Sequence, residues 1–287
     1  MEAIKNRYEF TVIFEAENSN PNGDPDAGNM PRVDPETSIG LVTDVCLKRK
    51  IRNFVEIYKE GEPGYNILIK PDRSLNSKFA DAYTASGLEL GKKGKNSDDV
   101  KMARDYICKN YFDVRAFGAV MSTGDNPCGI VRGPVQINFA KSIDPVFPQD
   151  ISITRQAKTN DDRMEKGETE MGRKSIIPYG LYRADGYVSA MLAQKVTGFS
   201  EEDAELLWTA IINMFEHDRS AARGRMCVRK LYVFKHDTAL GNAPAQTLFD
   251  KIEIVKNDGV VAPRKFSDYT IKVDKVMPEG VTMIEKI

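Results

Sequence analysis

The residues of this chain that could do chemistry are cations gathered in two short stretches. The first stretch contains no acid and holds four cations within five positions: Lys48, Arg49, Lys50 and Arg52. The second, residues 219–230, also contains no acid, and its cations are Arg219, Arg223, Arg225, Arg229 and Lys230. A charged run is usually a solvated face, but arginine and lysine gathered in this way also bind phosphate groups. The sequence therefore predicts a phosphate-binding groove if the fold brings the two stretches together.

A polar loop at residues 18–29 offers a second kind of site. It is typical of an Asx-rich turn that joins a strand to a helix, or of a loop whose amides and backbone N–H groups meet a phosphate backbone. Asn18, Asn20 and Asn22 with Gly23 superficially match a calcium loop. That match fails because the first ligands are not carboxylates and Asn29 stands where the bidentate Glu belongs.

Three aspartates in the same region, Asp24, Asp26 and Asp34, could bind a metal or act as acid and base in RNA cleavage. No His or Lys lies nearby in the sequence to complete such a site, and solvated turn aspartates are common. Spacing alone does not separate the two interpretations, and we favour the turn.

Cysteine chemistry and zinc binding are not indicated by the sequence. The four cysteines are spread along the chain without a CxxC pair, and His217 and His236 are the two histidines. Cys128 has no histidine next to it in the sequence to serve as a base. The loop around it, residues 122–133, lacks the ending of a Walker motif. We therefore expect no catalytic residue, no metal and no cofactor.

The composition is that of a folded, non-membrane protein. The chain has 287 residues, 41 Lys+Arg against 42 Asp+Glu, and a formal net charge of −1, which excludes a bulk polycation. Its content of 41% hydrophobic and 29% charged residues excludes a disordered chain. No apolar run reaches the ~18 residues of a membrane span. We expect a cytoplasmic protein with reduced thiols.

The elements that must position these residues follow from hydrophobic periodicity. Residues 8–14 alternate as a strand, and a helix follows with one apolar face, made of Leu47, Ile51, Phe54, Val55 and Tyr58. Residues 114–121 and 135–140 are predicted to be strands paired as an antiparallel hairpin. Ser200, with Asp203 three residues later, predicts the start of a second helix, and residues 226–235 predict a last strand.

The resulting order is strand, helix, strand, strand, helix, strand. It predicts an α+β, ferredoxin-like fold, the topology of the RNA-recognition motif. Two insertions interrupt it, one at residues 61–112 and one at 150–182. Because this fold hosts many functions, topology alone does not specify one.

Several longer motifs resemble the backbone subunit of type I CRISPR Cascade. The nearest match is the type I-C form, in the Csd/Csh branch of the seventh Cas family within the RAMP superfamily. The motifs that carry this resemblance are residues 20–25, 40–53, 115–118, 132–138, 172–182 and 213–224. The resemblance runs from about Tyr8 to Phe249.

The resemblance implies a right-hand-shaped protein. Its RNA-recognition-motif palm would comprise residues 8–60, 113–140 and 200–235, with fingers at 61–112 and a thumb hairpin within 150–182. Copies would stack head to tail along a guide RNA, and the thumb of one copy would fold over the guide of the next. Met164 and Met171 would wedge at a base step.

On the family pattern, a shared set of residues would hold the guide phosphates: Asn20, Asn22, Lys48, Arg49, Arg52, Arg132, Arg173, Lys174, Arg219, Arg223 and Arg225. Such contacts position a strand without reading its sequence. Specificity would come from pairing between the guide and a target DNA strand in an R-loop. Expected partners are other copies of the chain, a guide-processing endoribonuclease, a large PAM-reading subunit, a small subunit and a recruited helicase-nuclease, with no membrane partner.

Two other functions remain open from the residues alone. The first is a metal-dependent ribonuclease on the same fold that cleaves target RNA through Asp24, Asp26 or Asp34. The second is a ferredoxin-like module that binds a phosphate metabolite as a monomer.

Overall fold

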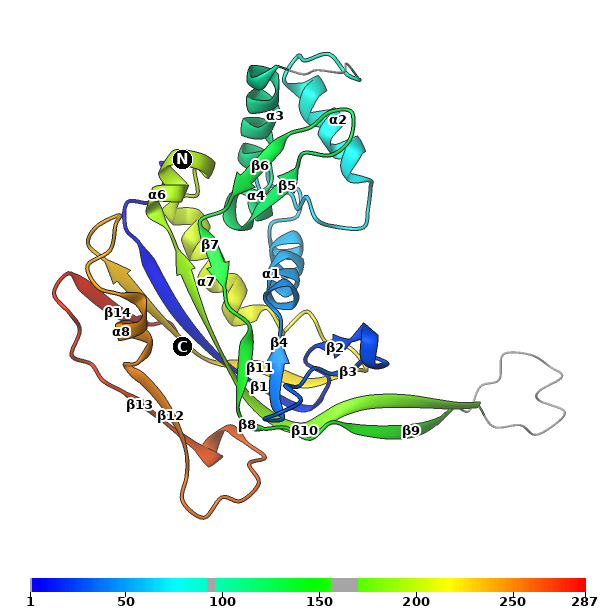
Figure 1. Ribbon diagram of the computed structural model, residues 1–287, viewed down its shortest axis with the longest axis vertical. Helices are drawn as coiled ribbons and strands as arrows, with labels where there is room; N and C mark the ends of the chain where they lie inside the picture. The colour runs from blue at the N-terminus through cyan, green and yellow to red at the C-terminus, as the bar shows by residue number, and fades with distance from the viewer. Residues whose placement is uncertain (1, 92–95, 156–169) are drawn as a thin grey trace, which may run out of the picture.

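The computed structural model describes residues 2–91, 96–155 and 170–287, a mixed α/β fold built on a central antiparallel sheet (Figure 1). Its strands run in the order β14 (Val281–Glu285), β11 (Arg223–His236), β1 (Tyr8–Ser19), β10 (Glu170–Val188), β8 (Ala140–Pro145) and β4 (Ile39–Val42). Two further strands, β7 (Val135–Ile137) and β9 (Gln149–Arg155), also pair with β10. Strands distant in the sequence therefore meet at β1, which lies between β10 and β11.

The central strand β1 is buried on both faces. Phe10, Val12 and Phe14 belong to the main hydrophobic core, whereas Glu9 and Glu15 alternate with them and are buried on the opposite face. The alternation predicted the strand, but a polar face would ordinarily lie in solvent. Glu9 is satisfied by His236 at 2.5 Å between its Oε2 and Nε2. A second layer of the fold must therefore cover that face.

Helices α1 (Asp44–Tyr58) and α7 (Glu201–Asn213) pack on the first face. The start of α7 is confirmed: Ser200 and Asp203 form a reciprocal capping box, which satisfies backbone N–H groups at the helix start. The apolar face of α1 is confirmed for its first four members and is wrong for Tyr58, which is 58% exposed. Tyr58 lies at the end of the helix and stacks on Phe54 at a centroid distance of 5.3 Å instead of entering the core.

The C-terminal residues cover the second face of the sheet. This layer contains α8 (Ala245–Phe249), β12 (Ile252–Lys256), η3 (Phe266–Asp268) and β13 (Tyr269–Val273). Its core joins Ile13 and Phe234 of the sheet to Leu248 of α8. Arg183 of β10 fastens the layer by donating to the carbonyl oxygens of Phe249 and Ile252 at 2.9 and 2.8 Å.

A helical unit with a core of its own lies at one end of the molecule (Figure 1). It contains α2 (Leu75–Ala85), α3 (Ser97–Asn110), α4 (Phe112–Phe117) and the hairpin of β5 (Gly118–Met121) with β6 (Gly129–Arg132). The strand predicted at 114–121 is wrong in its first half, because α4 buries Val114 and Ala116 as one helical turn between two cores. The predicted pairing of 114–121 with 135–140 is also wrong: β5 pairs with β6, and β7 pairs with β10.

An arm extends from the other end of the sheet. Strand β10 continues past the body of the molecule, and β9 pairs with its first part to form a two-stranded ribbon (Figure 1). Beside the root of the arm, β2 (Gly23–Asp24), η1 (Pro25–Ala27) and β3 (Met30–Pro31) form a small hairpin. The predicted wedge residue Met164 lies outside the described residues, whereas Met171 lies on the arm and is 72% exposed.

The remaining short elements, α6 (Ala190–Leu192) and η2 (Ala193–Thr197), connect β10 to α7. Across the described ranges, no helix combines the length and the apolar character that crossing a bilayer requires.

Candidate nucleic-acid interface

The cations of α1 are engaged within the chain. Lys48 is 9% exposed and its Nζ lies 2.9 Å from Asp44 Oδ2. Arg52 Nε donates to Asp113 Oδ2 at 2.9 Å, and its guanidinium lies 5.2 Å from the centroid of the Phe117 ring. The Arg52 contacts hold α1 against α4, whereas the Lys48 pair lies within α1.

The other two α1 cations also have intramolecular partners. Lys50 is almost completely buried and pairs with Asp218, which follows α7. Arg49 donates to the carbonyl oxygen of Ile69 at 2.6 Å. The stretch that is free of acid along the sequence is therefore surrounded by acceptors in space, and its charges stabilise helix packing.

The second cationic stretch is more accessible. Arg219 pairs with Glu216 at 2.6 Å, Arg223 with Asp218 at 2.9 Å and Arg225 with Glu17 at 3.2 Å. The Arg219 and Arg225 side chains are 57% and 64% exposed. Surface pairs of this kind contribute little stability and exchange readily for other anions. Arg219 and Arg225 can therefore turn to a phosphate at low cost, whereas Arg223 pairs with the buried carboxylate of Asp218, which also pairs with Lys50.

The polar loop at residues 18–29, which we call the Asn-rich loop, is anchored at both of its predicted contact residues. Asn22 Oδ1 accepts from the backbone N–H and the hydroxyl of Thr43 at 2.9 and 3.0 Å, and Thr43 caps the start of α1. The Asn20 backbone N–H donates to the Ala222 carbonyl oxygen at 2.8 Å. Asn20 Nδ2 donates to the Asn29 carbonyl oxygen at 2.7 Å. The loop is therefore a fixed wall that joins β1, α1 and the turn before β11.

This wall and the root of the arm enclose a cavity of about 280 Å³, which we call the arm-root cavity. It brings together three of the predicted contact residues, Asn20, Arg173 and Lys174. Its complete lining is Asn20, Ala27, Gly28, Asn29, Met30, Asp150, Arg173, Lys174, Ser175 and Ala222. Within the described ranges, no carboxylate lies within ion-pair distance of Arg173 or Lys174. The lining carries two cations and one carboxylate, Asp150, so the cavity has a net positive charge beside amide and hydroxyl groups.

Glycine is required where the Asn-rich loop and β11 approach each other. A Cβ built on Gly224 of β11 would lie 2.2 Å from the Asn18 carbonyl oxygen. Gly28, in the cavity wall, has a φ of 61°, a left-handed conformation that favours glycine. Gly224 therefore allows β11 to lie against the backbone of the loop, and Gly28 allows the turn within it.

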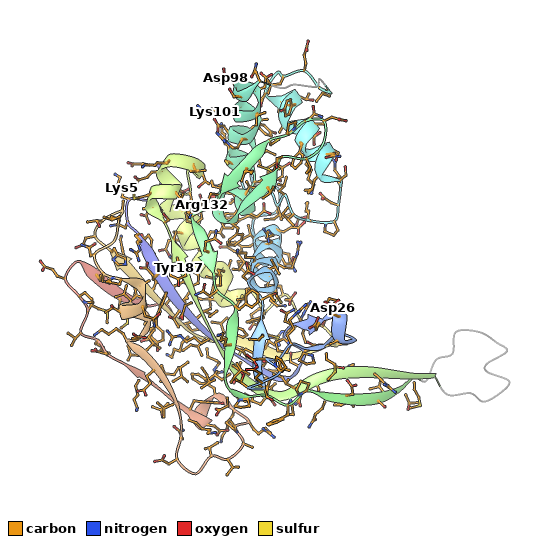
Figure 2. The ribbon with its side chains drawn as sticks, viewed as in Figure 1. Lys5, Asp26, Asp98, Lys101, Arg132 and Tyr187 are labelled. Carbon is orange, nitrogen blue, oxygen red and sulfur yellow. The ribbon has the colours of Figure 1, made fainter. Side chains whose placement is uncertain are left out.

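Arg132 is placed apart from the arm-root cavity. It lies on β6 and is exposed, and it has no hydrogen-bond or ion-pair partner among the residues that the structure describes. Figure 2 shows Arg132 near the helical unit, at a distance from Asp26 of the small hairpin. The predicted contact residues thus form two accessible groups, one at the arm root and one at β6.

The three candidate catalytic aspartates serve turns. Asp24 pairs with Arg32 at 3.3 Å and caps the N–H of Asp26. Asp34 accepts from the backbone N–H groups of Glu36 and Thr37 at 2.9 and 3.1 Å, and these hydrogen bonds lower the pKa of its carboxyl. These hydrogen bonds are those of Asx turns, which is the interpretation that we favoured from the sequence. In the described part of the chain, no three His, Cys, Asp or Glu side chains gather as metal ligands.

The cysteines are all free. Burial raises the pKa of the Cys108 thiol to about 11 and that of the Cys128 thiol to about 12. Thiols with such pKa values remain protonated at neutral pH, and they are poor nucleophiles.

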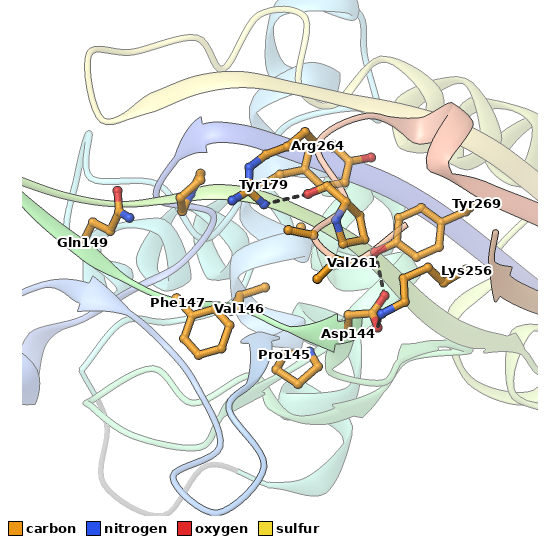
Figure 3. A pocket seen from close by; sticks show the side chains of 14 residues that line it. Asp144, Pro145, Val146, Phe147, Gln149, Tyr179, Lys256, Val261, Arg264 and Tyr269 are labelled. Carbon is orange, nitrogen blue, oxygen red and sulfur yellow. Dashed lines mark hydrogen bonds and ion pairs between the residues drawn. The ribbon is translucent and has the colours of Figure 1, made fainter. Parts of the chain in front are cut away.

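A second cavity, of about 490 Å³, lies between β8, the start of β9 and the C-terminal layer (Figure 3). Neighbouring strand residues point to opposite faces, so Gln149 lines this cavity and Asp150 lines the arm-root cavity. The carboxylate of Asp144, which lines this cavity, already has partners within the chain. It accepts hydrogen bonds from Lys256 at 2.9 Å and from the Tyr269 hydroxyl at 2.8 Å. The cavity offers mainly proline, valine and aromatic surface.

The sequence did not single out two residues of the arm-root cavity, Asp150 and Ser175. They are cross-strand partners in the arm, and the Ser175 hydroxyl donates to the Asp150 carboxylate. Only the register of β9 against β10 places them beside Asn20. Spacing along the chain gives no signal for that register.

The comparisons with known proteins agree with one another. A family model described as CRISPR-associated protein Cas7 matches residues 6–274. A CRISPR-associated protein Cas7 of Haloferax volcanii is 27% identical over 235 residues, which cover 72% of this chain. The chain spans 65% of the length of that curated relative.

Two solved structures are similar to the chain in shape. One, described as a CRISPR RNA-guided surveillance complex, pre-nicking, has a TM-score of 0.50 and 15% identity, and the match covers 79% of this chain and 78% of that one. The other, a CRISPR RNA-guided surveillance complex, has a TM-score of 0.46 and 14% identity and covers 79% and 68%. The first supports the mixed α/β fold described above. Because the family model spans almost the whole chain, the chain belongs to the Cas7 family of CRISPR-associated proteins.

Proposed function

We propose that this chain is a guide-RNA-binding, repeating backbone subunit of a type I-C Cascade surveillance complex. The observation that carries the proposal is the arm-root cavity, which Arg173, Lys174 and Asn20 line together in a chain of the Cas7 family. A lining with a net positive charge and neighbouring amides suits a sugar–phosphate backbone, which it would hold without reading the bases.

The fold supports a division of labour in this proposal. The strands β11, β1, β10 and β8, with α1 and α7, would be a ferredoxin-like palm. The helical unit would be the fingers, and the β9–β10 arm would be the thumb, with Met171 as a wedge that enters a base step. The C-terminal layer covers the second face of the sheet, so guide bases would not stack on that face as they do in RNA-recognition motifs.

The predicted contact residues take two roles in the proposal. Phosphates would be held directly by two loop residues and six cations: Asn20, Asn22, Arg132, Arg173, Lys174, Arg219, Arg223 and Arg225. Lys48, Arg49 and Arg52 would act by fixing α1 beneath the loop, because their polar atoms contact acceptors within the chain.

The subunit would have no catalytic role, and it would present the guide for pairing with target DNA in an R-loop. Its partners would be its own copies, a guide-processing endoribonuclease, a large PAM-reading subunit, a small subunit and a recruited helicase-nuclease. Target recognition would then depend on base pairing, as in other RNA-guided systems.

The test is to purify the chain from cells that express a CRISPR array and its partner subunits, and to extract and sequence the copurifying RNA. We expect guide RNA in stoichiometric amounts with several copies of the chain. The charge reversal R173E/K174E should strip that RNA. The matched control K5E/K101E reverses two lysines that lie away from the arm (Figure 2) and should retain it.

Two outcomes would overturn the proposal. One is a monomer without RNA, which would indicate a small-ligand module. The other is cleavage of labelled complementary RNA at regular steps in Mg²⁺, abolished by Asp24→Ala or Asp34→Ala, which would indicate a ribonuclease on the same fold.

A further inference from the structure

The arm-root cavity contains a group that a pure phosphate site would avoid. Asp150 is exposed and lines the cavity together with Arg173 and Lys174. An ionised carboxylate repels phosphate and only accepts hydrogen bonds. Its presence beside cations therefore indicates a ligand that carries a hydrogen-bond donor close to its negative charge.

The position of this carboxylate is set by the arm. Asp150 and Ser175 are directly opposite each other in the β9–β10 ladder, and Ser152 and Arg173 form the next pair on the same face. The Ser175 hydroxyl donates to Asp150 Oδ1, which orients the carboxylate and leaves its other oxygen free of a partner among the described residues. Arg173 makes no ion pair with Asp150, although both line the cavity.

The opposite wall supplies a second acceptor. Asn20 is 6% exposed, and its Nδ2 is held by the Asn29 carbonyl oxygen at 2.7 Å. Its Oδ1 is buried without a hydrogen-bond donor among the described residues. A buried acceptor without a partner is costly, so a shift of the loop that exposed this oxygen to a ligand hydroxyl would relieve the cost.

We propose that Asp150 makes the arm-root cavity selective for RNA over DNA, by accepting a hydrogen bond from a ribose 2′-hydroxyl while Arg173 holds the adjacent phosphate. This inference rests on the proposed guide-RNA function and names the residue that selects the sugar. The 2′-hydroxyl is the donor that an RNA backbone has and a DNA backbone lacks. A cavity of about 280 Å³ is slightly smaller than pockets for drug-sized ligands, and it suits a sugar and its phosphate without the base.

The selection has two parts that act in the same direction. With RNA, the hydrogen bond to a charged acceptor offsets the repulsion between Asp150 and the phosphate. With DNA, the repulsion remains and nothing compensates for it. The carboxylate therefore acts against DNA at least as much as it acts for RNA.

The experiment measures binding of the full chain to three single strands of one sequence: RNA, DNA and 2′-fluoro RNA. The 2′-fluoro strand keeps the sugar pucker of RNA but cannot donate a hydrogen bond. We expect the unaltered protein to prefer RNA over both other strands by about tenfold or more, the range of a hydrogen bond to a charged group.

The variants Asp150→Asn and Asp150→Ala should bind DNA and 2′-fluoro RNA more tightly, and the RNA-to-DNA ratio should approach one. Asp98→Asn is the matched control, because Asp98 lies on α3 at the far end of the molecule (Figure 2), and it should keep the ratio. Arg173→Ala should weaken RNA and DNA equally, since it removes a phosphate contact.

The outcomes separate this inference from the function on which it rests. RNA binding with an unchanged RNA-to-DNA ratio in both Asp150 variants would overturn the inference alone. The same holds if 2′-fluoro RNA binds the unaltered protein as tightly as RNA does, because shape would then replace the donor. If the unaltered protein binds no RNA, the proposed function falls and the inference falls with it.

Discussion

The guanidinium of Arg115 grips the carboxylate of Asp203 through two buried hydrogen bonds, from Nε to Oδ2 at 2.8 Å and from Nη2 to Oδ1 at 2.7 Å. Arg115 also donates to the carbonyl oxygens of Gly64, Cys108 and Lys109. Asp203 caps the start of α7. One ion pair therefore joins the helical unit to α7.

Removing one partner of this pair should destabilise the protein strongly. We expect Arg115→Ala to lower the free energy of unfolding by about 3–5 kcal/mol, because it leaves a buried carboxylate and three carbonyl groups without their donor. Chemical denaturation with circular dichroism would measure the loss. The double variant R115M/D203L should lose less than the sum of the single variants, and a strictly additive result would contradict the coupling.

The variant Asn22→Asp would test whether the Asn-rich loop contacts RNA or only supports the fold. Asn22→Asp retains an oxygen that can accept from Thr43, so the thermal midpoint should hold close to that of the unaltered protein. Its amide donor is replaced by a negative oxygen, so RNA affinity should fall about three- to tenfold, the range of one net hydrogen bond of 0.5–1.5 kcal/mol. An unchanged affinity would restrict Asn22 to capping the start of α1.

Salt dependence would identify which cations meet phosphates. The logarithm of RNA affinity should fall linearly with the logarithm of salt concentration, with a slope of about 0.7 per phosphate contacted on a single strand. Arg173→Ala should reduce that slope by about 0.7, because Arg173 has no acid partner among the described residues. A flat salt series for the unaltered protein would refute the phosphate groove.

Alkaline pH should destabilise the fold through its buried thiols. The Cys108 and Cys128 pKa values are raised to about 11 and about 12 by burial, whereas a thiol in the unfolded chain ionises near about 8.5. The unfolded state therefore releases these protons first, and the free energy of unfolding should fall as pH rises from about 9 towards 11. Denaturant titrations at pH 8.5 and 9.5 would measure the fall.

The matched variant for this prediction is Cys128→Ala. It should be less stable at every pH because it leaves a small cavity, but its stability should fall less steeply with pH. An identical slope in the variant and the unaltered protein would show that Cys128 does not titrate on unfolding.

Local patterns predicted the parts of the fold that local physics decides. Strand β1, the apolar face of α1 and the capping box of α7 follow from spacing and from residue types within a few positions. The strand expected at residues 114–121 is wrong at 114–117, where tertiary packing buries the residues in the short helix α4, and right at 118–121, which is β5. The prediction for Tyr58 is wrong because this last residue of α1 lies at the surface and stacks on Phe54.

The candidate site was predictable in its residue types and only partly in its geometry. The sequence showed cations without acids nearby, but it could not show that Asp113 and Asp218 approach α1 from distant segments. It likewise could not reveal Asp150 in the arm-root cavity, since that depends on the register of β9 against β10. Arg173 and Lys174 were reached through the family resemblance, and the structure places both in the cavity lining.

Strand β10 runs without interruption from Glu170 in the arm to Val188 in the sheet. Its inner part is paired with β1 over a long antiparallel register, from Tyr8 opposite Val188 to Ser19 opposite Ile177. A pull on the arm along its axis would load those backbone hydrogen bonds in shear, all at once, and would not peel them apart one by one. The arm is thus mechanically a rigid extension of the core, so a subunit held by its arm would transmit tension directly through its central sheet.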